Sequence, residues 1–346
     1  MRGSFLVIFS LVNISCIFAV PLDYANYNND ENSLGEWEPE EPIEQIDLFQ
    51  TERPLGHVSG LAVNANGHVV AFHRGDRVWD ENSFNADEIF SKSLAPITNK
   101  TIVIMDKSGK IVDEFGDDQF YMPHGLTIDK SGNYWVTDVG SHQVHKIDAA
   151  SKKIVMSLGE KMVPGEDQQH FCKPTDVAVA SNGHFFVADG YCNSRILKFD
   201  KDGKVLAEIN AAVEPNQPTD FVVPHSIALI EDLNIICVAD RENERVQCFS
   251  AGLAEGERKL PTGIPITSAN DIGRVYAIRE KEHQLIGVTG SSADVEAQMF
   301  TIAVQTGETH TFAKGIENAH ALAISNDGSV YVSQLAPNRI LKISPN

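Results

Sequence analysis

Short runs of alternating apolar and polar residues recur along most of the chain, and each run ends in a polar turn. Within residues 173–200, apolar residues take alternate positions on both sides of an Asn182-Gly183 turn: Val177, Val179, Phe185 and Val187. Alternation with a period of two is typical of half-buried strands, and Asn-Gly favours a tight two-strand turn. The pattern therefore predicts β-hairpins.

The same hairpin recurs at a constant interval. The first strands begin at Ser59, His124, Thr175, His225 and His320. The second strands end at His73, Asp138, Asp189, Asp240 and Gln334. The two anchors are 14 residues apart in four copies and 15 apart in the copy from His225 to Asp240.

A weaker copy at residues 272–289 fills the long gap before His320 and brings the number of units to six. Units of about 50 residues with four strands each predict an all-β fold, a six-bladed β-propeller closed on itself. A two-sheet sandwich would not explain the constant interval. We expect one folded body over residues 48–346.

The segment before the repeats differs in composition. Residues 1–20 place Arg2 before an apolar run from Phe5 to Val20, which is typical of a secretory signal. Residues 21–47 are rich in Asn, Glu and Pro and predict an acidic disordered linker or a removable pro-segment. No later stretch has the roughly 20 apolar residues of a membrane span. We therefore expect a protein that is secreted or lies in the lumen of the secretory pathway.

Cysteine usage agrees with an oxidising compartment. Cys16 lies in the signal region, and an even set remains: Cys172, Cys192, Cys237 and Cys248. Three pairings are possible, and we favour nearest neighbours within a repeat, which pairs Cys172 with Cys192 and Cys237 with Cys248. No CxxC spacing supports a zinc site made of cysteines.

Two further features bear on modification and partners. Asn99-Lys100-Thr101 is an N-glycosylation sequon in an expected surface loop. The formal net charge of −20 argues against nucleic acid as a partner, because binding a phosphate backbone needs clustered Lys and Arg. A monomer is the default expectation for the oligomeric state.

Three histidines share one position of the repeat, since His124, His225 and His320 each begin a first strand. Three other residues follow the end of a second strand: Arg74, Tyr191 and Arg241. These two ends of an antiparallel hairpin lie at one edge of the sheet, so all six side chains should meet at one mouth of the central channel. Three neutral imidazoles with a fourth position open make a catalytic zinc site. The remaining candidates are interpreted as surface or packing residues: His57, His73, His142, His145 and His184.

Tyr191 is a candidate general base. Its turn is one residue longer than the matching turn between Asp240 and Arg245, and Cys192 would hold it in place. Two arginines beside one tyrosine could lower its pKa from about 10 toward neutrality, which takes roughly 4 kcal/mol of preferential phenolate stabilisation. A phenolate beside the metal, at this mouth of the channel, could then remove a proton from the substrate. Packing of the tyrosine and ion pairing of the arginines are the structural alternatives.

Long segments over most of residues 57–250 resemble one enzyme family. Sequences of the peptidyl-α-hydroxyglycine α-amidating lyases are similar to four segments of this chain: VAFHRGDRVWDENSF, YMPHGLTIDKSGNYWVTDVGSHQVHKID, VADGYCNSRI and CVADRENERVQCF. The spacing from Asp240 to Arg245-Val246 resembles the NHL repeat. The resemblance implies a zinc enzyme that splits a peptidyl-α-hydroxyglycine into an amidated peptide and glyoxylate, the last step of peptide-hormone amidation. The monooxygenase that makes the hydroxyglycine is absent from this sequence, so a separate protein would supply the substrate.

The resemblance also implies residue roles. It makes His124, His225 and His320 the zinc ligands, Tyr191 the base, Arg74 its activating partner and Arg241 a cation that orients substrate. It implies the same two cysteine pairs that nearest-neighbour pairing favours.

A structural calcium ion in the family is held by backbone carbonyls that match Val58 and Leu126, and by an Asp directly after the last histidine. Here that position is Ala321. Losing a carboxylate removes both charge and an oxygen ligand from a hard-cation site, so calcium affinity should fall sharply or vanish.

Two other functions compete with the lyase. A metal-dependent propeller hydrolase would place Asp, Glu and Asn around the channel, and three histidines argue against it. A propeller without activity could instead serve as a protein-binding module, because the last unit departs from the pattern at Ala319, Ala321 and Gln334.

Overall fold

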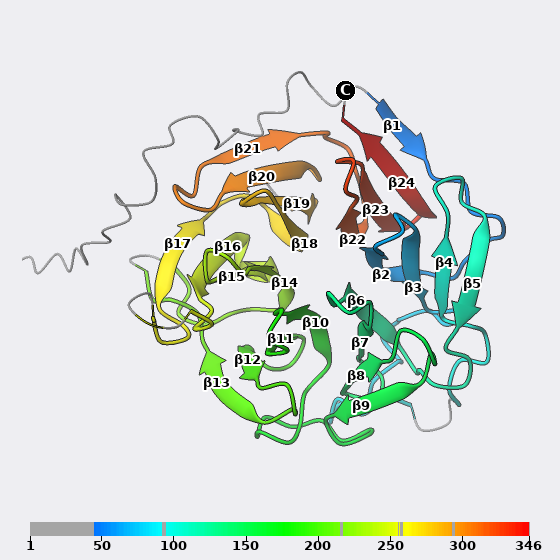
Figure 1. Cartoon of the computed structure of the whole chain (residues 1–346), viewed down its shortest axis with the longest axis horizontal. Helices are drawn as coiled ribbons and strands as arrows, with labels where there is room; N and C mark the ends of the chain where they lie inside the picture. The colour runs from blue at the N-terminus through cyan, green and yellow to red at the C-terminus, as the bar shows by residue number, and fades with distance from the viewer. Residues whose placement is uncertain are drawn as a thin grey trace, which may run out of the picture. The chain divides into compact units, whose positions relative to one another are not determined.

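The alternating segments form strands in the computed structural model, which describes residues 45–91, 95–214, 217–254, 256, 259–292 and 295–345. The strands pair into antiparallel sheets of four, here called blades (Figure 1). Blade 1 contains β2 (Val58–Val63), β3 (Val69–His73), β4 (Ile102–Met105) and β5 (Ile111–Phe115). Blade 2 contains β6 (Pro123–Ile128), β7 (Tyr134–Asp138), β8 (Gln143–Ile147) and β9 (Ile154–Leu158). Blade 3 contains β10 (Pro174–Val179), β11 (Phe185–Asp189), β12 (Arg195–Phe199) and β13 (Val205–Ile209).

The other three blades follow in chain order. Blade 4 contains β14 (Pro224–Ile230), β15 (Ile235–Asp240), β16 (Arg245–Ser250) and β17 (Pro265–Ala269), with the short 3-10 helix η2 (Arg241–Asn243) between β15 and β16. Blade 5 contains β18 (Arg274–Lys281), β19 (Gln284–Gly290), β20 (Met299–Ala303) and β21 (Thr309–Phe312). Blade 6 contains β22 (Ala319–Ile324), β23 (Val330–Leu335), β24 (Asn338–Ser344) and β1 (Gln45–Leu48).

The predicted six-bladed β-propeller is confirmed, and every predicted hairpin is present. The weak copy at residues 272–289 forms β18 and β19 of blade 5. Figure 1 shows the first strand of each blade near the axis and the fourth at the rim.

The last blade is closed by the beginning of the described chain. Strand β1 pairs antiparallel with β24, from Gln45 opposite Ser344 to Leu48 opposite Leu341. Residues 45–47 were predicted to belong to the acidic segment, whereas they are part of the propeller. The segment alternates between polar and apolar residues, but a run of only four residues, all exposed, is too short to be recognised as a strand. The predicted signal and most of the acidic segment, residues 1–44, lie outside the described residues.

Neighbouring blades are held together by apolar side chains that face one another. Phe72 and Ile102 of blade 1 share one cluster with Leu126 and Val136 of blade 2. Similar clusters join blades 2 and 3, blades 3 and 4, blades 4 and 5, and blades 6 and 1. Burying both faces of the inner strands in this way fixes the strand ends around the channel.

Both favoured disulfides are present: Cys172 with Cys192 and Cys237 with Cys248. The second joins directly opposed residues of β15 and β16. Asn99 of the sequon is exposed. Among the described residues, no helix has the length and apolar character needed to cross a membrane.

Candidate metal centre and active site

Each inner strand carries a register shift near its start. In blades 4 and 6 the shift falls at His225 and His320, and in blade 2 it spans His124. In the other blades it falls at Ser59, Thr175 and Tyr276. A bulge takes a residue out of the ladder and redirects its side chain. The repeat position that the histidines share is therefore a bulge that turns them out of their sheets.

The three histidines come from alternate blades and meet. Their ligand atoms lie within 4.8 Å of one another, and all three side chains are buried. The ring centres are 4.8 Å apart for His124 and His225, and 4.9 Å for each other pair. No other group of three or more potential ligands of this kind is found among the described residues.

Hydrogen bonds to the next blade around the ring fix which nitrogen of each imidazole faces the axis. His124 Nδ1 lies 2.8 Å from the Thr175 carbonyl, His225 Nδ1 2.6 Å from that of Tyr276, and His320 Nδ1 3.0 Å from that of Ser59. A carbonyl can only accept, so each Nδ1 must donate and each neutral ring keeps its lone pair on Nε2. Orientation of this kind is what a metal-binding histidine needs.

Electrostatics keep the three rings neutral. Burial, followed by the nearby Arg74, lowers the pKa of His124 to about 3. Burial and the neighbouring His124 lower the pKa of both His225 and His320 well below 6.5. Neutral imidazole is the form that binds metal, so protons compete with a cation only in acid. The three histidines therefore fit a bound metal ion.

Tyr191 lies beside this cluster. Its hydroxyl is 2.9 Å from His124 Nε2 and 3.0 Å from His225 Nε2. The turn that carries it begins at Gly190, where any Cβ would lie 2.1 Å from the Pro224 carbonyl. Only glycine lets the end of β11 approach blade 4 this closely.

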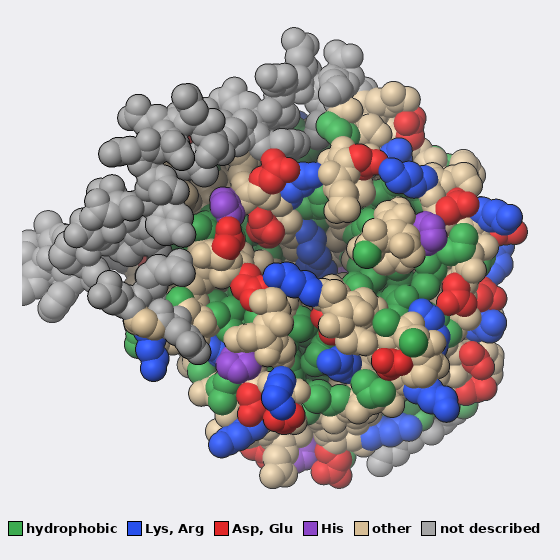
Figure 2. All heavy atoms as spheres, viewed as in Figure 1, with side chains coloured by type: hydrophobic (Ala, Val, Ile, Leu, Met, Phe, Trp, Pro, Cys, Tyr) green, Lys and Arg blue, Asp and Glu red, His purple; other side chains and the backbone are tan. Residues whose placement is uncertain are grey.

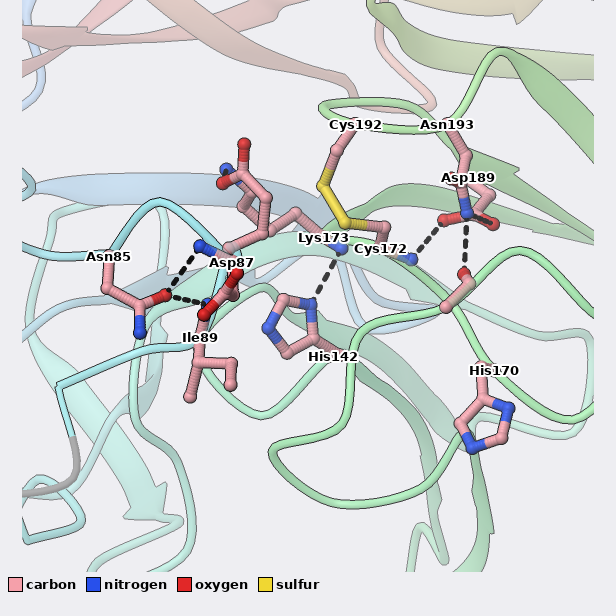
Figure 3. Close-up of a disulfide and its surroundings, with 12 residues drawn as sticks. Asn85, Asp87, Ile89, His142, His170, Cys172, Lys173, Asp189, Cys192 and Asn193 are labelled. Atoms are coloured by element: carbon pink, nitrogen blue, oxygen red, sulfur yellow. Dashed lines mark hydrogen bonds and ion pairs between the residues drawn. A yellow bond between two sulfur atoms is a disulfide. The ribbon is translucent and has the colours of Figure 1, made fainter.

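The Cys172–Cys192 disulfide anchors the same turn (Figure 3). Beside it, Asp189 accepts hydrogen bonds from the Cys172 backbone N–H at 2.8 Å and from the Asn193 side chain at 2.7 Å. The predicted role of Cys192 in holding this turn is consistent with these contacts.

The two predicted arginines lie close enough to Tyr191 for their charges to act on its phenol. The Arg241 guanidinium carbon is 5.5 Å from the centre of the Tyr191 ring, and Arg241 Nε donates to Glu242 at 2.7 Å. Arg74 is buried and donates from Nε to the Pro123 carbonyl at 3.0 Å, next to His124. Burial lowers the pKa of Arg74 to about 10, which leaves it charged at neutral pH.

The expected fall in the pKa of Tyr191 is not produced by the two arginines. Burial raises the pKa of this phenol above 10, and the charges of Arg241 and Arg74 only partly oppose that rise. Desolvation of the phenolate is the larger effect. The arginines alone do not make Tyr191 a base at neutral pH.

Sequence reasoning missed two aromatic residues of the site. The Trp79 ring centre lies 4.8 Å from that of Tyr191, and its face receives the Arg74 cation at 5.3 Å. Tyr276 lies 5.3 Å from His225, ring centre to ring centre, and 5.0 Å from the Arg241 guanidinium carbon. Tyr276 occupies the blade 5 bulge, so its repeat position could have identified it. Trp79 lies in the insertion after β3, where no repeat position exists to guide a prediction.

The histidines outside the shared position stay outside the cluster. His73, His142 and His145 are buried, and burial lowers the pKa of each to about 4. His145 Nδ1 lies 2.8 Å from the Ser157 hydroxyl, and His142 Nδ1 accepts from the Lys173 backbone N–H at 3.0 Å. None of them belongs to the candidate metal group.

Family comparison agrees with the repeat structure. The NHL repeat model matches residues 120–147, 171–199 and 221–249, which cover the first three strands of blades 2, 3 and 4. Among solved structures, streptogramin B lyase superposes with a TM-score of 0.53 at 18% identity, over 87% of this chain and 98% of that one. A gluconolactonase from Xanthomonas campestris gives 0.57 at 12% identity, over 87% and 89%. At these identities the likeness concerns the fold alone.

Curated proteins are much more similar. A Caenorhabditis elegans protein named "Probable peptidyl-alpha-hydroxyglycine alpha-amidating lyase pgal-1" is 66% identical over 99% of both chains. Peptidyl-alpha-hydroxyglycine alpha-amidating lyase 2 of Drosophila melanogaster is 41% identical over 85% of this chain and 72% of its own length. Peptidyl-glycine alpha-amidating monooxygenase B of Xenopus laevis is 40% identical over 84% of this chain, which spans only 34% of that protein. The chain belongs to the peptidyl-alpha-hydroxyglycine alpha-amidating lyase family and is an enzyme of that kind.

Proposed function

We propose that the enzyme is a zinc-dependent lyase that converts a peptidyl-α-hydroxyglycine into an α-amidated peptide and glyoxylate. One observation carries the proposal: three buried imidazoles from alternate blades turn their Nε2 atoms toward one point, next to the Tyr191 hydroxyl. His124, His225 and His320 would hold the ion. Zinc bound there would act as a Lewis acid toward an oxygen of the substrate.

Tyr191 is the proposed general base. Its hydroxyl lies within hydrogen-bond distance of two of the proposed metal ligands, His124 and His225. Removal of the substrate's hydroxyl proton lets the oxygen lone pair form a carbonyl, while the C–N bond breaks and its electron pair stays on nitrogen. The nitrogen takes a proton and leaves as the carboxamide, and the other fragment leaves as glyoxylate. The burial that raises the pKa of Tyr191 means that cations must stabilise the phenolate.

Arg241 and Arg74 supply permanent positive charge to this site. The substrate ends in a carboxylate, and a guanidinium is suited to bind it. Arg241 is partly exposed at the end of β15 and is the better placed of the two to meet substrate. Arg74 is buried against Trp79 and is better placed to stabilise the Tyr191 phenolate.

The proposed substrate implies a partner reaction. A hydroxylated glycine must be made by an oxygenase, and we propose that a separate monooxygenase supplies it to this chain. The two disulfides fit an oxidising compartment, and we propose secretion or the lumen of the secretory pathway as the location.

Turnover of a hydroxyglycine peptide by zinc-loaded Tyr191→Phe protein tests the mechanism. Loss of a general base should lower kcat about 10²–10⁴-fold, with zinc content unchanged. Tyr134→Phe is the matched control, because Tyr134 is buried in blade 2 and its hydroxyl contacts Lys152 away from the site. Full turnover by Tyr191→Phe would exclude the proposed base. Absence of glyoxylate formation by the zinc-loaded wild-type protein would exclude the proposed reaction.

A further inference from the structure

Side chains link the inner strands of different blades around the channel. Within the part of the chain that the structure describes, each sheet belongs to a single blade. No backbone hydrogen bond of a sheet therefore joins one blade to the next. The Ser59 hydroxyl donates to the Pro123 carbonyl at 2.8 Å, and the Thr175 hydroxyl to the Pro224 carbonyl at 2.7 Å. Such side-chain hydrogen bonds hold neighbouring blades together at the axis.

The largest of these links is built on Asp176 of β10. This buried carboxylate accepts from the Ser226 hydroxyl at 2.9 Å and from the Ile227 N–H at 3.1 Å, both on β14. It also accepts from Arg279 of β18 at 2.9 Å. Three consecutive blades are therefore joined by one carboxylate and one guanidinium.

Arg279 has further contacts that hold it in the channel. The same guanidinium nitrogen lies 3.0 Å from the Ser226 hydroxyl and 2.8 Å from the Ile278 carbonyl. Arg279 lines a channel cavity together with Leu126 and Ala323. Figure 2 shows a face of the molecule that is hollowed at its centre, with basic side chains inside the hollow.

The residues around this cavity do not fit the calcium ion that the family resemblance implies. Asp176 and Ala321 each directly follow the bulge residue of their inner strand, so Ala321 is the blade 6 counterpart of a carboxylate. Its methyl group is buried and offers no ligand. Leu126, one of the two expected carbonyl donors, lines the cavity that Arg279 already lines. Glu280 also lines this cavity, but its carboxylate accepts from the His283 N–H at 2.9 Å within its own hairpin.

We infer that the Arg279 guanidinium is the structural cation of this channel, and that the protein folds and remains stable without calcium. A hard divalent cation takes six to eight oxygen ligands and is favoured by several carboxylates. Asp176 is already paired with a fixed positive charge, and a divalent ion beside that charge would be repelled. The protein therefore supplies the cation as a side chain.

Metal content and calcium titration of the wild-type protein form the first test. Zinc-loaded protein, dialysed in a buffer that fixes free zinc, should contain no stoichiometric calcium after equilibration with millimolar CaCl₂. Its Tm should be the same with and without calcium. One bound calcium per chain, or a Tm that rises with calcium, would overturn the inference.

The second test replaces the Arg279 guanidinium and compares the change in Tm with that of a second arginine on the same strand, β18. Arg279→Met leaves a buried carboxylate unpaired and should lower Tm by roughly 5 °C or more. Arg274→Met is the matched control, because Arg274 is on the same strand but forms an exposed ion pair with Glu242 at 3.2 Å, and it should shift Tm little. The double variant Asp176→Asn/Arg279→Met should be no less stable than Arg279→Met, because the unpaired charge is gone.

Equal Tm shifts for the Arg279 and Arg274 variants would show that Arg279 is not a structural cation. If Arg279→Met does not fold, the calcium measurements on wild-type protein still decide the inference. Both tests read metal content and Tm rather than turnover, so their outcome is independent of the proposed zinc lyase mechanism.

Discussion

His124, His225 and His320 show how the role of a residue follows from its position in a strand. Each is displaced from its ladder by a bulge and donates from Nδ1 to a bulge carbonyl in the next blade. The three histidines could be predicted as a group because they share a repeat position. The hydrogen bonds that select the tautomer involve backbone atoms, which no residue type reveals.

The buried His145 gives a residue-scale prediction on pH. Burial, followed by Lys161, lowers its pKa to about 4, whereas an unfolded histidine titrates near 6.5. The unfolded state then binds more protons below pH 6.5, so this group contributes stability above pH 6.5 that is lost as the pH falls toward 4. Between pH 8 and pH 5 the wild-type protein should lose about 2 kcal/mol more unfolding free energy than His145→Gln.

Urea unfolding at several pH values measures this difference. Above pH 6.5 the gap between the two proteins should be constant, which serves as the internal control. Parallel curves down to pH 5 would mean that His145 is protonated in the folded protein.

At the scale of elements, the hairpin is the unit that the sequence specifies most clearly. Turn residues, alternation and the constant interval identified every inner hairpin, including the weak one in blade 5. Strand β1 was missed because it is exposed and pairs with β24, nearly 300 residues away. Its existence depends on a partner rather than on its own pattern.

The two disulfides hold different elements, so removing each of them should have a different effect on turnover and on stability. Cys192 directly follows Tyr191, so Cys172→Ala/Cys192→Ala should loosen the turn that carries the proposed base and lower kcat/KM at least 10-fold. Cys237 and Cys248 join two neighbouring strands, so Cys237→Ala/Cys248→Ala should cost about 2–3 kcal/mol of stability and leave turnover of zinc-loaded protein within about twofold.

Steady-state kinetics and urea unfolding of both double variants separate the two effects, and each variant is the control for the other. Equal losses of kcat/KM in the two variants would show that the Cys172–Cys192 disulfide has no special role in positioning Tyr191.

At the scale of the whole molecule, the proposed metal ligands come from blades 2, 4 and 6. An ion held by all three would connect alternate blades at the axis, in addition to the apolar clusters between neighbours. Metal binding to the folded state alone stabilises it by about 2.7 kcal/mol when the free metal is 100-fold above Kd. For a propeller of this size, zinc should raise Tm by roughly 5 °C.

Thermal unfolding of chelated and zinc-reconstituted protein measures this shift. His225→Ala should abolish it, because only two imidazoles remain. His184→Ala is the control and should keep the shift, because His184 lies outside the three-histidine group. An unchanged zinc response in His225→Ala would contradict the proposed ligand set.

The six units, their hairpins and the grouping of His124, His225, His320 and Tyr191 could be predicted from the sequence, whereas the cysteine pairs were only the favoured choice among three. These features are local or periodic, so they can be read without coordinates. The tertiary structure alone decided how closely the rings approach, which nitrogen each presents, the place of Trp79 and the raised pKa of Tyr191. It also decided that Arg279 pairs with Asp176, 103 residues away. Distances, tautomers and desolvation arise when distant strands pack around one axis, and a linear pattern does not encode them.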